Sequence, residues 1–211
     1  MFLQPKTNLL LWPLLCASVP LFLVPLAEYI ALSPSGTRAP LWMTFPLGVI
    51  AGLSLLLLPI AIVCLGFNRT RYPGALIALS SAALFLAFIM SQKIGHRIRM
   101  DAFAKLAVRS QPLIAAIRSY EQRHGRPPES LSKLVPEFIP AVPTTGMGAY
   151  PNYEYFTPAT DYDNNPWILR VFTPTVGINF DQFLYFPLTN YPPKGYGGVL
   201  RRIGDWAYVF E

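Results

Sequence analysis

Three long apolar segments dominate the first half of the chain. They cover residues 9–32, 41–67 and 74–92, and the only charged side chain inside them is Glu28. A bilayer core of about 30 Å is crossed by about 20 apolar helical residues, which is the scale of these segments. The pattern predicts three membrane-spanning helices and makes residues 1–92 a transmembrane region.

The charged residues lie mostly outside this region. The sequence has 17 basic and 11 acidic residues, and only five of these 28 fall within residues 1–92. With 53% hydrophobic and 13% charged residues, the composition excludes a soluble enzyme that fills the whole chain. The 14% aromatic share excludes a disordered chain, and two cysteines are too few for a disulfide scaffold.

The first apolar segment has an alternative interpretation as a cleaved signal peptide. Its prolines, Pro13, Pro20 and Pro25, kink a helix but are tolerated in membrane spans. The segment is longer than the roughly 7 to 15 residues of a signal core, and Leu15 precedes Cys16 where a lipoprotein signal carries a small residue. We therefore predict a span. Cys16, like Cys64 in the second segment, is expected to be a small buried hydrophobic residue.

The basic residues near the segments leave the orientation open. Three spans place Lys6, Arg69 and Arg71 on one side of the membrane. The other side carries Arg38, Lys93, Arg97, Arg99 and Lys105. The positive-inside rule then favours a cytoplasmic C-terminal half, unless the later charges belong to a folded helix.

Residues 93–125 are predicted to form an amphipathic helix that continues the third span. Apolar and small side chains recur there at three- and four-residue spacing, at Phe103, Leu106, Ser110, Leu113, Ile114, Ile117 and Tyr120. Pro112 should kink the helix. Gly125 should end it in a left-handed cap, where His124 is expected to cap carbonyl groups.

Residues 126–211 are predicted to form a small antiparallel β domain, after a short helical turn at 129–135. The expected strands are 153–157, 167–173, 183–186, 199–203 and 206–210. Gly204 and Asp205 would form a two-residue hairpin turn, with Trp206, Tyr208 and Phe210 on one face of the last strand. The fold class is thus three membrane helices plus an α+β part in which a long helix packs on a small sheet.

The basic character of the chain belongs to the membrane side. Residues 93–110 contain five basic residues and one acid, whereas residues 111–211 contain eight basic and nine acidic residues. A nearly neutral domain does not suit a polyanion, so no nucleic-acid partner is expected. The lipid bilayer is the partner that the composition supports.

One motif carries a resemblance to a known family. Residues 115–143 contain, in order, Tyr120, Gly125, Pro127, Leu131, Leu134 and Pro143, and a tyrosine-rich stretch follows at 150–155. This order resembles the region after the long helix in type IV pilin-like proteins, particularly the major pseudopilins of type II secretion. The resemblance implies a pilin-like domain outside the cytoplasmic membrane and, as partners, other envelope or secretion-system proteins. It favours an inner-membrane protein with a periplasmic domain.

The resemblance does not extend to the start of the pilin-like helix. Ala78 and Leu79 stand where such helices carry a glutamate, and two apolar segments precede this helix. We therefore expect a domain held permanently in the membrane, without leader processing or filament assembly.

Few side chains suggest chemistry. Glu28 is the only acid in the apolar half, and an intramembrane acid is a candidate functional residue unless it snorkels to the interface. His96 and His124 are separated by about 42 Å along a straight helix at 1.5 Å per residue, so they cannot form one site. Asp161, Asp163 and Asn165 match the opening of a D-x-D-x-N calcium loop.

Two residues argue against the calcium loop. Pro166 and Phe172 replace the glycine and the glutamate of the full motif, so a polar turn is the alternative. The resemblance keeps calcium open, because some major pseudopilins bind it in this region. An enzyme would have to combine acids such as Asp161, Asp163, Asp181 or Asp205.

No nucleophile elbow, P-loop, dinucleotide fingerprint or HExxH motif is present. We therefore predict a protein without catalytic residues or cofactor that binds or assembles with other proteins in the cell envelope. The alternative is a membrane-embedded subunit of a transport or lipid-handling complex, with the β domain as a lid.

Overall fold

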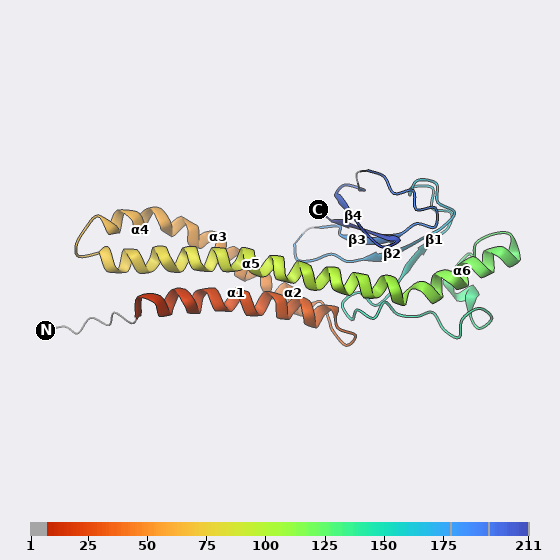
Figure 1. Ribbon diagram of the computed structural model, residues 1–211, viewed down its shortest axis with the longest axis horizontal. Helices are drawn as coiled ribbons and strands as arrows, with labels where there is room; N and C mark the ends of the chain where they lie inside the picture. The colour runs from red at the N-terminus through yellow and green to blue at the C-terminus, as the bar shows by residue number, and fades with distance from the viewer. Residues whose placement is uncertain (1–7, 178, 194, 211) are drawn as a thin grey trace. The chain divides into compact units, whose positions relative to one another are not determined.

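The computed structural model describes residues 8–177, 179–193 and 195–210 (Figure 1). Two compact units make up the chain. The first unit consists of Met1–Ile30 and Ala39–Arg99, and the second consists of Ala31–Arg38 and Met100–Glu211.

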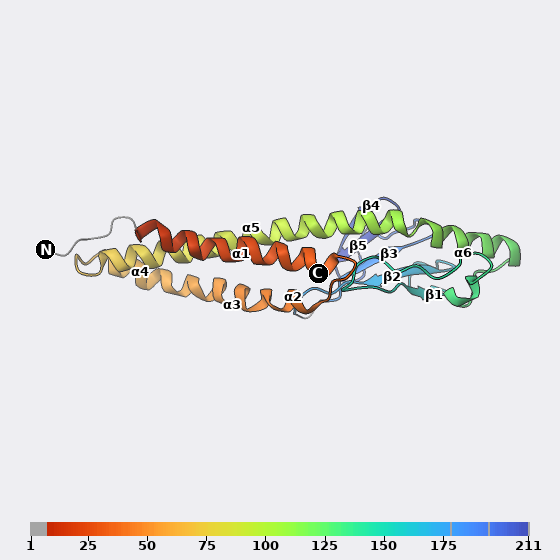
Figure 2. The same ribbon diagram turned by 90° about the horizontal axis from the view of Figure 1, so that it is seen from below.

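The first unit is helical. Its helices are α1 (Asn8–Leu32), α2 (Ala39–Trp42), α3 (Thr44–Ser54), the 3₁₀ turn η1 (Leu55–Leu57), α4 (Leu58–Leu65) and the first part of α5 (Arg71–Arg109). In this unit α1, the α3–α4 segment and α5 run side by side in both views (Figures 1 and 2). By length and composition, three helices could cross a membrane: Leu11–Leu32, Ala39–Leu65 and Arg71–His124.

The structure confirms the three apolar helices and corrects two of their boundaries. The second segment is not one regular helix, because η1 separates α3 from α4. Pro59 explains the interruption. Its nitrogen carries no hydrogen to donate to the carbonyl of the residue four positions earlier, and its ring clashes with that carbonyl group. The third helix begins at Arg71, three residues before the predicted start, and its continuation beyond residue 92 into the polar sequence is confirmed.

In the first unit the large apolar side chains lie on the outside of the helices, whereas in a soluble helical bundle they lie in the core. Besides Val24, Leu41 and Arg99, the buried positions carry small residues or proline: Pro13, Pro20, Ala27, Ala51, Ala61, Gly74, Ser81, Ala87, Ser91 and Gly95. Large apolar side chains face outward, and Leu14, Phe22, Leu56 and Ile62 are 65 to 68% exposed. Small residues let helix backbones approach closely, and the outer surface is left apolar.

The second unit contains a five-stranded antiparallel sheet. The strands are β1 (Glu154–Phe156), β2 (Ile168–Phe172), β3 (Gln182–Tyr185), β4 (Val199–Ile203) and β5 (Trp206–Phe210), in the order β1-β2-β3-β5-β4. All five predicted strands are confirmed to within two residues at each end. The β4–β5 hairpin turn at Gly204 and Asp205 is also confirmed, and Gly204 has φ +60°. Glycine with positive φ at the first turn position is typical of a type II′ hairpin.

Helices of the second unit cover one face of this sheet. Phe103, near the end of α5, is fully buried, and its ring centroid lies 4.7 Å from that of Phe183 and 4.9 Å from that of Tyr208. Arg118 of α6 (Gln111–His124) donates a hydrogen bond of 2.7 Å to the hydroxyl of Tyr185. The prediction that a long helix packs on a small sheet is therefore confirmed.

Loops cover the opposite face. A buried cluster forms there from Ala159, Ile168, Leu184, Phe186 and Val209. Phe156, Tyr162, Tyr191, Tyr196 and Leu200 pack against it. Strand β5, which lies between β3 and β4, is consequently buried on both faces, whereas the sequence had indicated only one apolar face.

The end of the long helix follows the local sequence signals. Ser110 separates α5 from α6 two residues before Pro112, as the predicted kink requires. Gly125 has φ +72° and ends α6. Nδ1 of His124 lies 3.0 Å from the carbonyl oxygen of Tyr120, so its predicted capping role is confirmed. The predicted turn at 129–135 is the 3₁₀ helix η2 (Leu131–Leu134).

Buried tyrosines should make the second unit sensitive to alkali. Burial raises the pKa of Tyr153 to about 12 and also raises the pKa values of Tyr155, Tyr191 and Tyr196. The unfolded chain releases these protons from about pH 10, whereas the folded unit retains them. Stability is therefore full below pH 10 and falls as pH rises towards 12, by up to about 1.4 kcal/mol per pH unit for Tyr153.

Denaturant unfolding of the full chain in detergent micelles between pH 8 and 11.5 measures this loss. Tyr153→Phe removes one of the titrating hydroxyls and should make the alkaline decline shallower than in the wild type. An identical slope for the two proteins would show that Tyr153 does not contribute.

Candidate functional site

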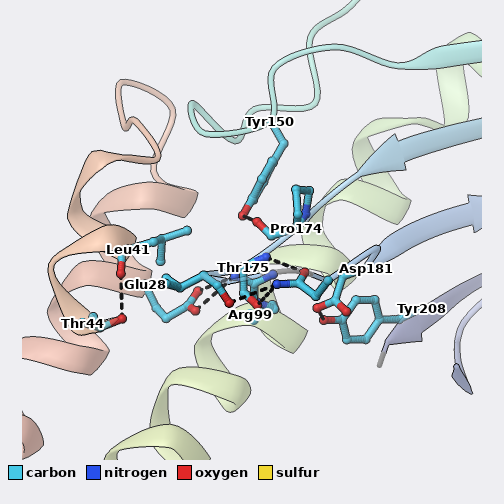
Figure 3. A network of polar contacts seen from close by, with 11 residues as sticks. Glu28, Leu41, Thr44, Arg99, Tyr150, Pro174, Thr175, Asp181 and Tyr208 are labelled. Carbon is cyan, nitrogen blue, oxygen red and sulfur yellow. Dashed lines mark hydrogen bonds and ion pairs between the residues drawn. The ribbon is translucent and has the colours of Figure 1, made fainter. Parts of the chain in front are cut away.

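An ion pair links two helices of the first unit. Nη2 of Arg99, on α5, lies 3.0 Å and 3.1 Å from the two carboxylate oxygens of Glu28, on α1 (Figure 3). The side chains are only 3% and 14% exposed, respectively. Glu28 therefore has a specific partner and does not snorkel alone, as the sequence had allowed.

Gly95 brings the two helices close enough for this pair. It lies one helical turn before Arg99, and a Cβ built at Gly95 would be 3.2 Å from Cγ of Glu28 and 3.8 Å from Cγ1 of Val24. A side chain at residue 95 would crowd the Glu28 side chain, which would have to shift. Two desolvated charges contribute little net stability together, but the loss of one leaves the other buried without its counter-charge.

A second set of contacts, which we call the loop clamp, lies within the second unit. It joins residues 31–38, the last two residues of α1 and the loop after it, to residues 145–150. The backbone N–H groups of Gly148 and Ala149 donate to the carbonyls of Ser33 and Ala31 over 2.8 Å and 3.0 Å. The Arg38 guanidinium lies 5.8 Å from the centre of the Tyr150 ring.

Hydrogen bonds of their own side chains fix the conformation of residues 145–150 in the clamp. Thr145 Oγ1 donates to the carbonyl of Tyr150 over 2.6 Å and accepts from the N–H of Met147 over 3.1 Å. The hydroxyl of Tyr150 donates to the carbonyl of Pro174 over 2.6 Å (Figure 3). The clamp is therefore a built structure and not a chance approach of two loops.

Gly148→Ala should open the clamp, because a Cβ there would collide with backbone atoms of Gly36. We expect trypsin to cleave after Arg38 at least about fivefold faster, since cleavage follows local opening. Limited proteolysis of the full chain with mass spectrometry measures the rate. Gly52→Ala is the control, since its Cβ would meet no atom within 4 Å. Equal cleavage of both variants would contradict the assignment.

The acids considered for an enzyme site do not converge. Asp181 is buried and accepts a hydrogen bond of 2.7 Å from Tyr208 (Figure 3). In the β3–β5 ladder Gln182 pairs with Val209, and Tyr185 pairs with Trp206. Asp181 and Asp205 therefore flank opposite ends of this ladder, and one pocket cannot hold both.

The candidate calcium segment forms a polar turn. The amide nitrogen of Asn165 donates to the Tyr162 carbonyl and to Asn190 over 2.7 Å and 2.8 Å, and its Oδ1 accepts from the N–H of Leu188 over 3.2 Å. Tyr196 donates to Asp163, while Asp161 is exposed. Both polar groups of Asn165 are thus used within the domain.

Other candidate residues remain separate. Among the described residues no group of three or more His, Cys, Asp or Glu side chains could hold a metal ion. Cys16 and Cys64 are free thiols, and both are half-buried, so the prediction that they are buried was wrong. Cys16 lines a groove with Leu76 and Ile77 of α5, and a Cβ built at Gly74 of α5 would lie 2.8 Å from Cβ of Cys64, so both cysteines lie beside a neighbouring helix and are only partly covered by it. His96 lies on α5 and His124 at the end of α6, as expected for histidines that share no site.

The second unit also has an apolar groove of about 320 Å³. One wall is helical and consists of Ala104, Ala107, Val108 and Gln111. The other wall is the tip of the β4–β5 hairpin, residues 203–206. We call this feature the helix–hairpin groove. Sequence reasoning missed it, because two alanines on a helix carry no signal of what faces them.

No family model, curated protein or solved structure matches this chain. The ion pair, the loop clamp and the groove are therefore interpreted from their own geometry.

Proposed function

We propose that this is an integral inner-membrane protein whose three helices anchor a pilin-like periplasmic domain with a non-catalytic binding or assembly role in the cell envelope. The distribution of side chains in the first unit carries the proposal. Large apolar groups face outward and small residues face inward, which suits a lipid environment and would be unfavourable in water.

The loop clamp supports the number of crossings. Residues 31–38 and 145–150 are in contact and must lie in one aqueous compartment. Two apolar helical segments, Ala39–Leu65 and the start of Arg71–His124, separate them in the chain. Two crossings return the chain to the same side, so the clamp is consistent with a hairpin of membrane helices after α1.

The ion pair supports a crossing by the first helix as well. Glu28, near the end of α1, pairs with Arg99, and residues 12 and 16 near its start share a groove with Leu76 and Ile77 of α5. The two helices therefore run parallel along their length, and α1 accompanies α5 through the same apolar layer.

The pilin-like resemblance favours the periplasm for the domain. The positive-inside rule, applied to the basic residues, favours the cytoplasm instead. That argument is weakened because Arg99 is neutralised by its ion pair with Glu28 and Arg38 packs against the Tyr150 ring. The separation of Asp181 from Asp205 supports a non-catalytic role. The buried ion pair favours the second candidate, a membrane-embedded subunit of a transport or lipid-handling complex, because charged pairs in membrane helices often mark working parts.

Exchange of residues 126–211 for an unrelated periplasmic domain distinguishes the two. Complementation of a deletion strain under envelope stress is the readout, with immunoblotting to confirm equal membrane levels. If the domain binds partners, the full chain restores growth and the chimera does not. A chimera that restores growth would contradict our proposal and leave the membrane helices as the working part.

A further inference from the structure

We propose that the open edge of β4, together with the helix–hairpin groove, binds an extended peptide segment of another envelope protein as an added strand. This inference rests on the proposed binding role and names its site and the chemistry of its partner.

Strand β4 ends the sheet, and among the described residues it pairs only with β5. The type II′ turn makes Ile203 and Trp206 the first hydrogen-bonded pair of the hairpin. Pairs alternate along an antiparallel ladder, so the backbone groups of Leu200 and Arg202 point away from β5. These groups form an edge to which another strand can add.

The opposite edge is less suited to this role. Strand β1 has three residues, whereas β4 has five. Its neighbour in the chain, Pro158, follows shortly after the strand and has no N–H to pair. A partner strand would therefore form a longer ladder on β4.

The helix–hairpin groove lies beside the β4 edge. Ile203 of β4 lines it, opposite Ala104 and Ala107 of α5, and the buried indole of Trp206 contributes to the lining. The short alanine side chains leave room between helix and strand. An edge strand beside a helix, with an apolar groove between them, can bind a peptide as an added strand. The groove then contacts every second side chain of the peptide.

The side chains of β4 specify the partner. Val199, Arg201 and Ile203 alternate on the same face of the sheet as Trp206, and Val199 is 61% exposed. Cross-strand neighbours pair by like polarity or opposite charge. The added strand should therefore carry apolar residues opposite Val199 and Ile203 and an acid opposite Arg201. Asp205 disfavours a second acid at the turn end.

A labelled heptapeptide, Thr-Val-Thr-Glu-Thr-Val-Thr, tests this pattern by fluorescence anisotropy with the full chain in detergent micelles. The matched peptide has lysine in place of glutamate. We expect the glutamate peptide to bind at least about tenfold more tightly, as expected when an opposite-charge pair is replaced by a like-charge pair. Arg201→Glu should reverse the preference.

Two variants test the site itself. Ala104→Trp fills the groove from an exposed helix position, and Leu200→Pro removes an outward N–H without removing a donor of the β4–β5 ladder. Each should weaken binding at least about tenfold. Lys105→Trp adds the same ring at the neighbouring exposed position, outside the groove lining, and should leave affinity within about twofold.

Absence of binding by the glutamate peptide, or affinity unchanged by Ala104→Trp with the fold intact by circular dichroism, would overturn the inference. Failure here is distinguishable from failure of the proposed function. If the domain exchange abolishes complementation but the peptide does not bind, the domain works through another surface. If the chimera complements, the binding role itself is wrong.

Discussion

Phe103→Ala should destabilise the second unit by about 3 to 5 kcal/mol, the usual cost of emptying a buried phenylalanine site. Phe103 is fully buried and stacks on Phe183, which in turn stacks on Trp206 with ring centroids 4.8 Å apart. It is one of the contacts through which the helices pack on the sheet, beside the hydrogen bond from Arg118 to Tyr185. A domain with a total stability of about 5 to 15 kcal/mol would lose a large share of it.

Urea unfolding of the full chain in micelles measures this loss, with near-ultraviolet circular dichroism as the signal. Trp167 and Trp206 of the second unit are both buried and contribute to that signal. Val108→Ala is the control, since Val108 lies on the same helix and is 72% exposed; it should cost less than about 0.5 kcal/mol. A small loss for Phe103→Ala would mean that the helix does not depend on this contact.

Glu28→Leu should destabilise the first unit by about 3 to 5 kcal/mol, because it leaves the guanidinium of Arg99 buried without its carboxylate. The double variant Glu28→Leu with Arg99→Leu should recover most of that loss, since two apolar side chains can replace a buried pair. This recovery of stability is the mark of a buried ion pair. For an exposed pair, the single and the double variants would have nearly the same stability.

Thermal unfolding in micelles or nanodiscs measures both variants. Lys93→Leu is the matched control, since Lys93 is exposed on the same helix, and it should change the midpoint little. If the double variant is as unstable as Glu28→Leu, the pair makes contributions beyond neutralising a buried charge, and our account of it would be wrong.

Local patterns in the sequence predicted most of the secondary structure. The strands follow short runs of aromatic and β-branched residues, and the end of α6 follows from Gly125 and His124, whose roles depend only on the preceding turn. The start of α5 could not be predicted in this way. The apolar composition begins at Gly74, but the helix already begins at Arg71, in polar sequence.

The candidate sites depend on contacts between distant residues. Glu28 and Arg99 are 71 positions apart, so the sequence showed an isolated acid and one more basic residue near the membrane. The loop clamp joins Ser33 to Gly148, and neither residue type indicates a partner. The groove likewise requires the helix and the hairpin tip to face each other, which periodicity along one element cannot reveal.

A topology map tests the central claim, a domain held outside the cytoplasm by three spans. Reporter fusions after Gly36, Arg69 and Gln92 and at Glu211 would use alkaline phosphatase, active outside the cytoplasm, and β-galactosidase, active inside. We expect residues 36, 92 and 211 to report the periplasm and residue 69 the cytoplasm. A cytoplasmic signal at Glu211 would contradict the placement of the domain, and opposite signals at Gly36 and Glu211 would contradict the three-span anchor itself.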